Sequence, residues 1–202
     1  MLIYIEYRSR RPNVDLELFH KIVGRRSGTW SDANPEDLAL FNVGRTWRIG
    51  PEPEYLIAYY TRNKGLGRLD DWERIFESGE VAQLEAQTRS VCRIDTAGCY
   101  VPLLEPAASE GGPYYAEFFE PTGSREEVAA LFEDRRKRYG DFTLNLVCDR
   151  IGKLGPEPPG LAFWSVPSYA SLETIAAELE GASDPIRLVA AGLYHDVGKE
   201  TL

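Results

Sequence analysis

Two glutamates in matching apolar segments are the strongest candidates for acid/base chemistry in this sequence. Glu6 lies in the run YIEYR and Glu117 in the run YAEFF. A carboxyl group in a partly dry setting can hold or release a proton near neutral pH, because burial disfavours its ionised form. The alternative is structural, and the residue types favour it: Glu6 would pair with Arg8 or Arg93, and Glu117 with Arg187, as buried polar contacts.

The orientation of these segments follows from strand geometry. Successive side chains of a strand point to opposite faces. Tyr4, Glu6 and Arg8 therefore share one face, and Tyr115 and Glu117 share the corresponding face of the later segment. The opposite set is the more apolar, so we expect it to pack beneath helices. The first set would then point into a space between two sheets.

The remaining candidates for ligand contacts are aromatic or basic. Tyr59 and Trp164 lie in strand-like runs, where they suit a flat, partly apolar ligand or, equally, a packed seam between sheets. Arginines can bind a carboxylate or phosphate with two hydrogen bonds, although pairing with the chain's own carboxylates is the favoured alternative. The candidate ligand-binding residues are Tyr4, Arg8, Arg48, Tyr59, Arg93, Tyr115, Trp164 and Arg187.

His195 is the best single candidate for a general base, since a histidine titrates near neutral pH. It stands beside Asp196 in LYHDVGKE, where a surface histidine is the favoured alternative. The other histidine, His20, has no partner at ligand spacing, so the sequence predicts no metal site. Two isolated histidines give weak support for a haem ligand, and we expect no cofactor.

Composition limits the classes of function. The chain has 202 residues, a net charge of −9 and 43% hydrophobic residues, which suits one large domain or two small ones. Its acidity argues against a nucleic-acid partner, which needs clustered Lys and Arg. No apolar run reaches the roughly 20 residues that span a bilayer, so no membrane partner is predicted. Three cysteines without a CxxC pair indicate reduced thiols in a cytoplasmic protein.

A repeated string organises the chain. Gly-Pro-Glu-Pro occurs at 50–53 and at 155–158, each time before an apolar, aromatic run. Three further pairs of segments match in the same order: IEY with AEF, LALFNV with TLNLVC, and RIDTAGCY with RLVAAGLY. Four ordered matches predict a tandem duplication, with copies at 1–106 and 113–202 joined by a turn-rich linker at 107–112.

Each copy is predicted to run strand, helix, two strands, second helix and last strand, with Gly-Pro-Glu-Pro between the middle strands. In the second copy, Ser124 and Glu127 form a capping box for the first helix, and the basic run at 133–140 is expected to be its solvated face. The second helices are expected around 72–76 and 172–179. This β-α-β-β-α-β order is the ferredoxin-like unit, which leaves one face of its sheet bare. The sequence therefore predicts an α+β fold: two tandem ferredoxin-like units packed sheet-to-sheet as a pseudo-dimeric α/β barrel.

Short motifs carry a family resemblance: Tyr4–Arg8, Ile49–Pro51 and Arg93–Ile94 in the first copy, and Glu117, Leu154–Pro156, Trp164 and Arg187–Leu188 in the second. With these residues the chain resembles the dimeric α/β-barrel superfamily and, within it, the NIPSNAP-type proteins. The copies differ, because Phe119 stands where the first has Arg8 and the first carries the insertion TRNKGLGRLDDW. The resemblance implies a shared fold and a wide range of activities: cofactor-free monooxygenases, polyketide cyclases, haem-dependent enzymes and isomerases.

The candidate residues and the resemblance together predict a small-molecule-binding α/β-barrel protein with its ligand between the two sheets. It would be a cofactor-independent monooxygenase-, cyclase- or isomerase-like enzyme that acts on an aromatic or carbonyl metabolite through Glu6, Glu117 or His195. The alternative is a non-catalytic NIPSNAP-like binding or protein-interaction module, because no strong catalytic motif is present. The sequence leaves this choice open. Since the duplication already pairs two units, the chain can be a monomer or a homodimer.

Overall fold

The computed structural model describes residues 1–202 apart from 34–35, 64, 78, 110, 177–184 and 198–202. The first half contains β1 (Leu2–Arg10), α1 (Leu16–Ala33), β2 (Asp37–Arg45), β3 (Tyr55–Thr61), a 3₁₀ turn η1 (Gly65–Gly67), α2 (Arg68–Phe76), α3 (Gly79–Val91) and β4 (Cys92–Pro102). The second half contains β5 (Pro113–Pro121), α4 (Arg125–Arg138), β6 (Thr143–Arg150), β7 (Gly160–Ser165), a 3₁₀ turn η2 (Tyr169–Thr174) and β8 (Ile186–Asp196).

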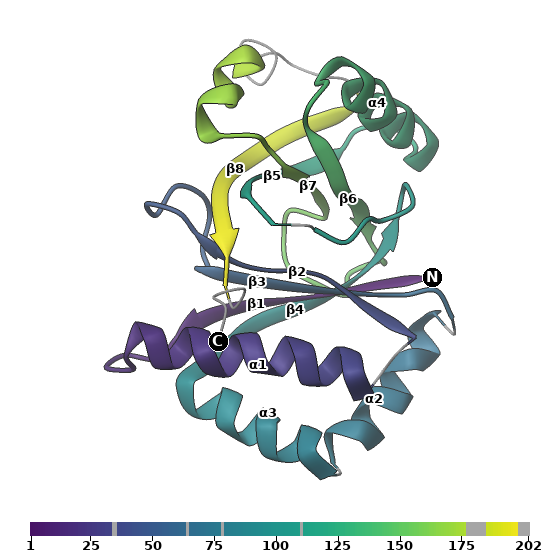
Figure 1. Cartoon of the computed structure of the whole chain (residues 1–202). Coiled ribbons are helices and arrows are strands. Elements are labelled where there is room, and N and C mark those ends of the chain that lie inside the picture. The colour runs from purple at the N-terminus through teal and green to yellow at the C-terminus, as the bar shows by residue number, and fades with distance from the viewer. Residues whose placement is uncertain (34–35, 64, 78, 110, 177–184, 198–202) are drawn as a thin grey trace.

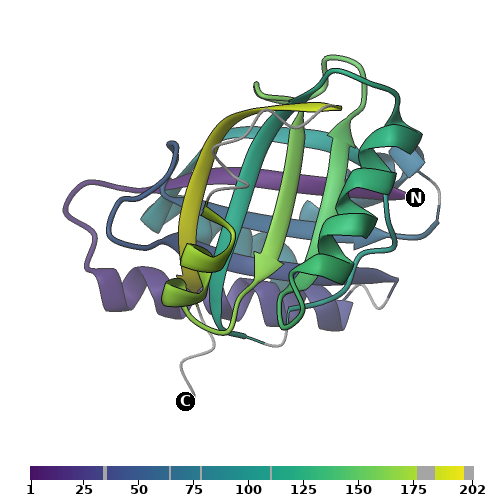
Figure 2. The ribbon, with the colours of Figure 1, turned by 90° about the horizontal axis from the view of Figure 1, so that it is seen from above.

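The strands of the described residues close into one antiparallel barrel in the order β1-β3-β2-β8-β5-β7-β6-β4. Within each half the order is ferredoxin-like, and the halves join at two short ladders, β2 with β8 and β4 with β6. Figure 1 shows the sheet of the first half below that of the second, and Figure 2 shows that their strands cross. The predicted fold class is confirmed. The boundaries of the two copies stay a prediction.

The helices cover the outer faces of this barrel. In Figure 1, α1, α2 and α3 lie below the sheet of the first half, and α4 and η2 lie above that of the second. The predicted capping box is present at the start of α4, where Ser124 and Glu127 exchange hydrogen bonds. Around 172–179 the structure has η2 in place of the start of the predicted helix, and residues 177–179 lie outside the described part. Along the described residues, none of the helices is both long and apolar enough to cross a bilayer.

The space between the two sheets is filled by a buried cluster, here called the interior cluster. Its members include Ile3, Ile5 and Tyr7 from β1 and Tyr114, Ala116 and Phe118 from β5. Rings from opposite sheets stack within it: Phe41 and Phe163 have centroids 4.0 Å apart. Because close-packed apolar side chains from both sheets meet here, this region holds the two halves together.

Each Gly-Pro-Glu-Pro turn rests on the last strand of the opposite half. The Thr46 N–H donates to the Leu193 carbonyl (2.7 Å), and the Leu193 N–H donates to the Ile49 carbonyl (3.0 Å). The other turn makes the corresponding two bonds with Cys99, at 2.7 and 2.8 Å. The repeated string therefore builds two equivalent contacts between the halves.

An arginine fixes each of these turns. Arg45 donates to the Gly50 carbonyl (2.8 Å) and pairs with Glu52 (2.6 Å). In the second half Arg150 makes the same two contacts, with the Gly155 carbonyl at 2.8 Å and a glutamate at 2.6 Å. The basic and acidic residues around the string thus hold the shape of the turn.

Candidate functional site

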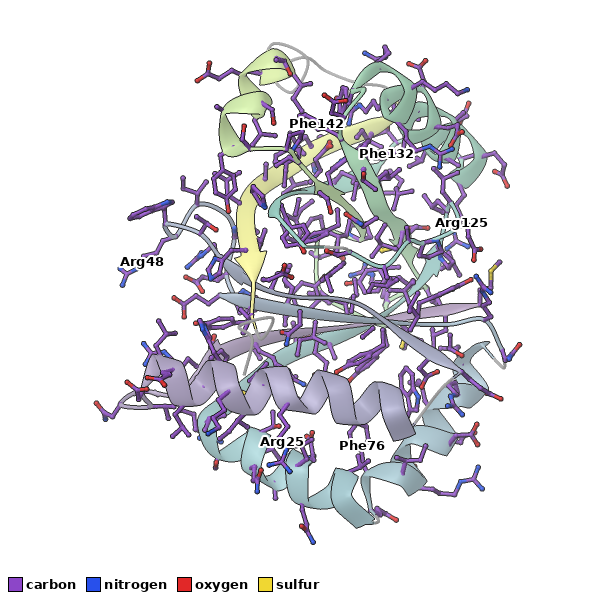
Figure 3. All side chains as sticks on the ribbon, in the orientation of Figure 1. Arg25, Arg48, Phe76, Arg125, Phe132 and Phe142 are labelled. Carbon is purple, nitrogen blue, oxygen red and sulfur yellow. The ribbon has the colours of Figure 1, made fainter. Side chains whose placement is uncertain are left out.

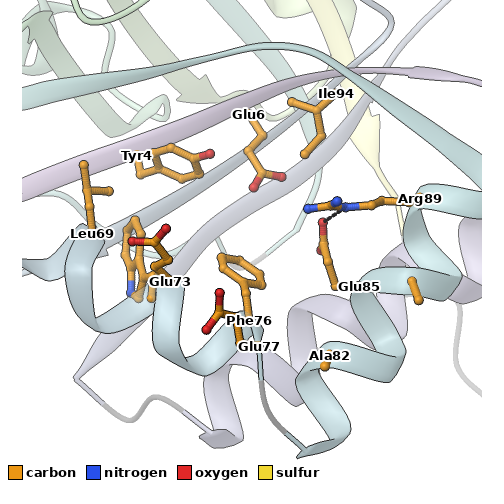
Figure 4. Close-up of a pocket in the computed structure, with 12 residues that line it drawn as sticks. Tyr4, Glu6, Leu69, Glu73, Phe76, Glu77, Ala82, Glu85, Arg89 and Ile94 are labelled. Atoms are coloured by element: carbon orange, nitrogen blue, oxygen red, sulfur yellow. Dashed lines mark hydrogen bonds and ion pairs between the residues drawn. The ribbon is translucent and has the colours of Figure 1, made fainter.

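A cavity of about 580 Å³, here called the Glu6 cavity, lies on the helix side of the first half, between the sheet and helices α2 and α3 (Figure 4). Its volume is within the range of small-molecule sites. The sheet supplies Tyr4, Glu6 and Ile94. The helical side supplies Leu69, Trp72, Glu73, Phe76, Glu77, Ala82, Glu85, Ala86 and Arg89.

The sheet forms the floor of this cavity. Tyr4 and Glu6 are two residues apart in β1, so both side chains point to the helix face. Strand β1 is central in its sheet, with Glu6 opposite Ile57 of β3 and Ala97 of β4. The side chain of Glu6 is 2% exposed, and its carboxyl group points into the cavity (Figure 4). The buried carboxyl group of Glu6 is thus held by a central strand of the sheet, which is a rigid support.

Helical spacing produces the opposite wall. Leu69, Trp72 and Phe76 stand at positions i, i+3 and i+7 of α2, which lie on one face of a helix. The Trp72 indole is fixed because its N–H donates to a carboxylate oxygen of Asp37 (2.7 Å). Its ring meets Tyr4 edge-on, with centroids 5.2 Å apart. The cavity therefore has a firm aromatic side.

Two ion pairs involve carboxylates of the cavity. Glu6 pairs with Arg8, and both side chains are buried. Glu85 accepts from the Arg89 Nε at 3.0 Å, an ion pair near the surface because the Arg89 side chain is 73% exposed. Each pair cancels one negative charge. The remaining lining carboxylates belong to the α2 side.

The corresponding space in the second half is filled. Glu117 is fully buried and accepts hydrogen bonds from Arg135 of α4 (2.7 Å) and from the Trp164 indole (3.0 Å). Burial, together with the charge of Glu117, raises the pKa of the neighbouring Tyr115. Glu117 thus makes a buried polar contact, but its partner is Arg135 and not Arg187. The expectation that the whole basic run of α4 faces solvent was wrong for Arg135.

The structure reverses the predicted orientation of the first strand of each half. Tyr4, Glu6 and Arg8 face the helices, not the space between the sheets, and Tyr115 and Glu117 do the same in the second half. The closed barrel interior offers few partners for a charge, so it takes the uncharged set of alternate residues. The helix side can supply arginines, indoles and an open cavity. The third-strand aromatics Tyr59 and Trp164 also lie on the helix side.

Three predicted arginines lie away from the Glu6 cavity. Arg48 is exposed in the turn between β2 and β3 and points away from the molecule (Figure 3). Arg93 pairs with Asp95, and Arg187 pairs with Glu120. Both arginine side chains are more than half exposed. The geometry does not bring these residues together with Glu6.

His195 lies at the end of β8, apart from the Glu6 cavity. Its Nδ1 lies 3.0 Å from the Thr46 hydroxyl, and its ring is 6.4 Å from that of His20. Partial burial lowers the pKa of His195, while the charge of Asp196 acts in the opposite direction. It does not line the Glu6 cavity, so Glu6 and His195 are not parts of one site.

Sequence reasoning missed the contribution of α3. Ala82, Glu85, Ala86 and Arg89 stand at i, i+3, i+4 and i+7 and form one face of this helix. That spacing was present in the sequence, but only one helix was expected between the third and last strands of the first half. The missed helix completes the cavity.

Comparison with known proteins supports the fold. No protein-family model matches the chain, and no curated protein matches it. A haem-binding protein from Thermus thermophilus superposes with a TM-score of 0.61 at 11% identity, over 96% of this chain and 90% of the other. A dye-decolorizing protein from V. cholerae gives 0.57 at 7%, over 97% and 93%. A chlorite dismutase from Candidatus Nitrospira defluvii gives 0.55 at 7%, over 98% and 91%. The chain has the dimeric α/β-barrel fold.

A haem group does not fit the residues of the Glu6 cavity. Haem iron needs an axial ligand such as histidine, cysteine, methionine or tyrosine. Among the described lining residues only Tyr4 is of these types, and its ring packs against Trp72. The propionates of haem are anionic, whereas four glutamates and one arginine line this cavity. The side chains present favour another kind of ligand.

Proposed function

We propose that this protein binds a small organic molecule in the Glu6 cavity. The observation that carries the proposal is a cavity of about 580 Å³ in which aromatic side chains face the buried Glu6. Ligand sites typically combine a mostly apolar lining with a few fixed polar groups, and this cavity has both. The interior cluster, by contrast, fills the space between the sheets where the sequence placed the ligand.

Replacing Ala86 by tryptophan is expected to abolish binding, because an indole on this face of α3 occupies the cavity. Native mass spectrometry of protein taken from its producing cell should show a bound small molecule on the wild type and none on Ala86→Trp. Ala130→Trp, an exposed alanine on α4 that does not line the cavity, should keep the molecule. Equal occupancy of both variants would rule out the cavity as the binding site.

For the chemistry, we propose proton transfer at Glu6 to or from an aromatic or carbonyl-containing ligand. A cofactor-independent monooxygenase-, cyclase- or isomerase-like enzyme would use such a step. The position of Glu6 supports this, because a carboxyl group that water scarcely reaches can exchange a proton with a bound molecule. The aromatic wall opposite it would hold a flat substrate in place.

A non-catalytic NIPSNAP-like binding module is the second candidate. Two observations favour it: Arg8 already engages a carboxylate oxygen of Glu6, and none of the described lining residues is histidine, cysteine or serine. Binding alone needs neither a nucleophile nor a second proton carrier. For both candidates a cytoplasmic location stays part of the proposal, supported by three buried free cysteines.

Glu6→Gln distinguishes the two candidates. A glutamine keeps the shape of the side chain and can still accept from Arg8, but it cannot transfer a proton. If Glu6 is catalytic, the variant should retain unconverted substrate, so the molecule extracted from it should differ from the one extracted from wild type, in mass or, for an isomerisation, in chromatographic retention at equal mass. Glu126→Gln, an exposed change on α4, should match wild type. The same molecule in all three proteins would favour the binding module.

A further inference from the structure

The Glu6 cavity carries more negative than positive charge. Four glutamates and one arginine line it, and the two ion pairs already described balance Glu6 and Glu85. Glu73 and Glu77 remain, one helical turn apart at the exposed edge of the cavity (Figure 4). In the described part of the chain no ion pair joins either of them to a basic side chain. Like charges at this spacing repel each other, so a cation bound beside them would relieve that repulsion.

Aromatic side chains lie beside Glu73 and Glu77 on the cavity side of α2. Trp72 precedes Glu73 and Phe76 precedes Glu77, and all four line the cavity. The face of an aromatic ring attracts a cation through its quadrupole, and sites that recognise ammonium groups combine aromatic rings in this way. The carboxylates and the rings therefore favour the same sign of charge. An anionic ligand would be attracted neither by the carboxylates nor by the faces of the rings.

We propose that the ligand of the Glu6 cavity is an organic cation, in which an ammonium group is attached to an aromatic or aliphatic body. The ammonium group would lie near Glu73 and Glu77, and the apolar body would contact Tyr4, Trp72 and Phe76. This inference rests on the proposed function, since it names the class of molecule that the cavity holds. A metal ion is not the cation meant, because the described residues contain no group of three metal-ligating side chains.

Three probes of similar size test the charge preference. Phenethylammonium is cationic, 2-phenylethanol is neutral and 3-phenylpropanoate is anionic, and all three carry the same ring. Isothermal titration of the full chain should show phenethylammonium binding about tenfold more tightly than the alcohol, with the anion weakest. The preference should shrink at high salt, because the carboxylates at the edge are exposed and therefore screened.

Two double variants separate a local effect from overall charge. Glu73→Gln with Glu77→Gln should reduce the preference for the cation over the alcohol to about twofold. Glu126→Gln with Glu173→Gln removes the same charge from exposed positions outside the cavity and should leave the preference unchanged. Equal losses in both double variants would overturn the inference.

The probes also distinguish a failure of this inference from a failure of the proposed function. If all three probes bind equally and Ala86→Trp blocks all of them, the cavity binds small molecules but the preference for a cation is wrong. If none binds at millimolar concentration, the inference is overturned as well. The proposed function is then still judged by the native mass spectra of Ala86→Trp and Ala130→Trp, which require no chosen probe.

Discussion

Replacing Arg135 by methionine is expected to lower the free energy of unfolding by about 3–5 kcal/mol. Arg135 and Glu117 are both buried and lie 2.7 Å apart, so the change leaves a carboxylate in the core without its cation. The Trp164 indole N–H would still donate to Glu117, at 3.0 Å, but an uncharged donor does not neutralise the carboxylate. Denaturation with urea measures the loss.

A neighbouring arginine on the same helix is the control. Arg136 pairs with Glu133 at 2.7 Å, but its side chain is half exposed, and such pairs contribute about 1 kcal/mol or less. Arg136→Met should therefore be nearly neutral. Combining Arg135→Met with Glu117→Leu should recover part of the loss, because no unpaired charge remains in the core. If Arg135→Met and Arg136→Met were equally stable, Glu117 and Arg135 would not form the buried ion pair that the structure shows.

Gly50→Ala is expected to cost about 3 kcal/mol of stability, through backbone strain and close contact together. Gly50 has φ of +129°, which side chains other than hydrogen rarely tolerate. A Cβ there would also lie 2.7 Å from the Cα of Gly192, in the last strand of the other half. Neither backbone can move without disturbing the hydrogen bonds between turn and strand. The loss should appear as a lower urea midpoint.

The second half supplies both a replicate and a control for this prediction. Gly155→Ala should show a similar loss, since its Cβ would lie 2.9 Å from the Cα of Gly98 and its φ is +154°. Gly152→Ala has a positive φ of +55° but open space around it, so it should cost only about 1 kcal/mol. If all three changes had the same small effect, the turns would not be the close contacts between halves that the structure shows.

The sequence was informative where the backbone itself demands particular residues. The repeated Gly-Pro-Glu-Pro string marked both turns, because glycine and proline restrict what a chain can do locally. Ser124 and Glu127 marked the start of α4 for the same kind of reason, since a capping box is a contact between near neighbours. Such features specify the order of strands and helices, and from that order the barrel follows.

The orientation of β1 could not be decided in the same way. Alternation divides the strand into Tyr4, Glu6 and Arg8 on one face and Ile3, Ile5 and Tyr7 on the other, but it does not say which face meets the helices. The choice depends on which environment can accept a charge. In the structure the helix side holds a cavity and the barrel interior is closed. Both properties arise from the packing of several elements, so the sequence of β1 alone does not reveal them.

The candidate site was only partly visible for a related reason. Tyr4 and Glu6 were identified as candidates, but the cavity also needs α2 and α3, whose side chains meet β1 only through tertiary packing. Arg135 shows the same limit, because it was assigned to solvent on the strength of its basic neighbours. Its helical spacing from Phe132, three residues earlier, was the signal that placed it on the buried face.

The most direct test of the central claim is a crystal structure of protein taken straight from its producing cell and inspected for bound molecules. We expect electron density for a small molecule between β1 and helices α2 and α3, in contact with Glu6 and the aromatic wall. Density in the space between the two sheets, or a Glu6 cavity that holds only water in protein that carries a ligand elsewhere, would contradict it.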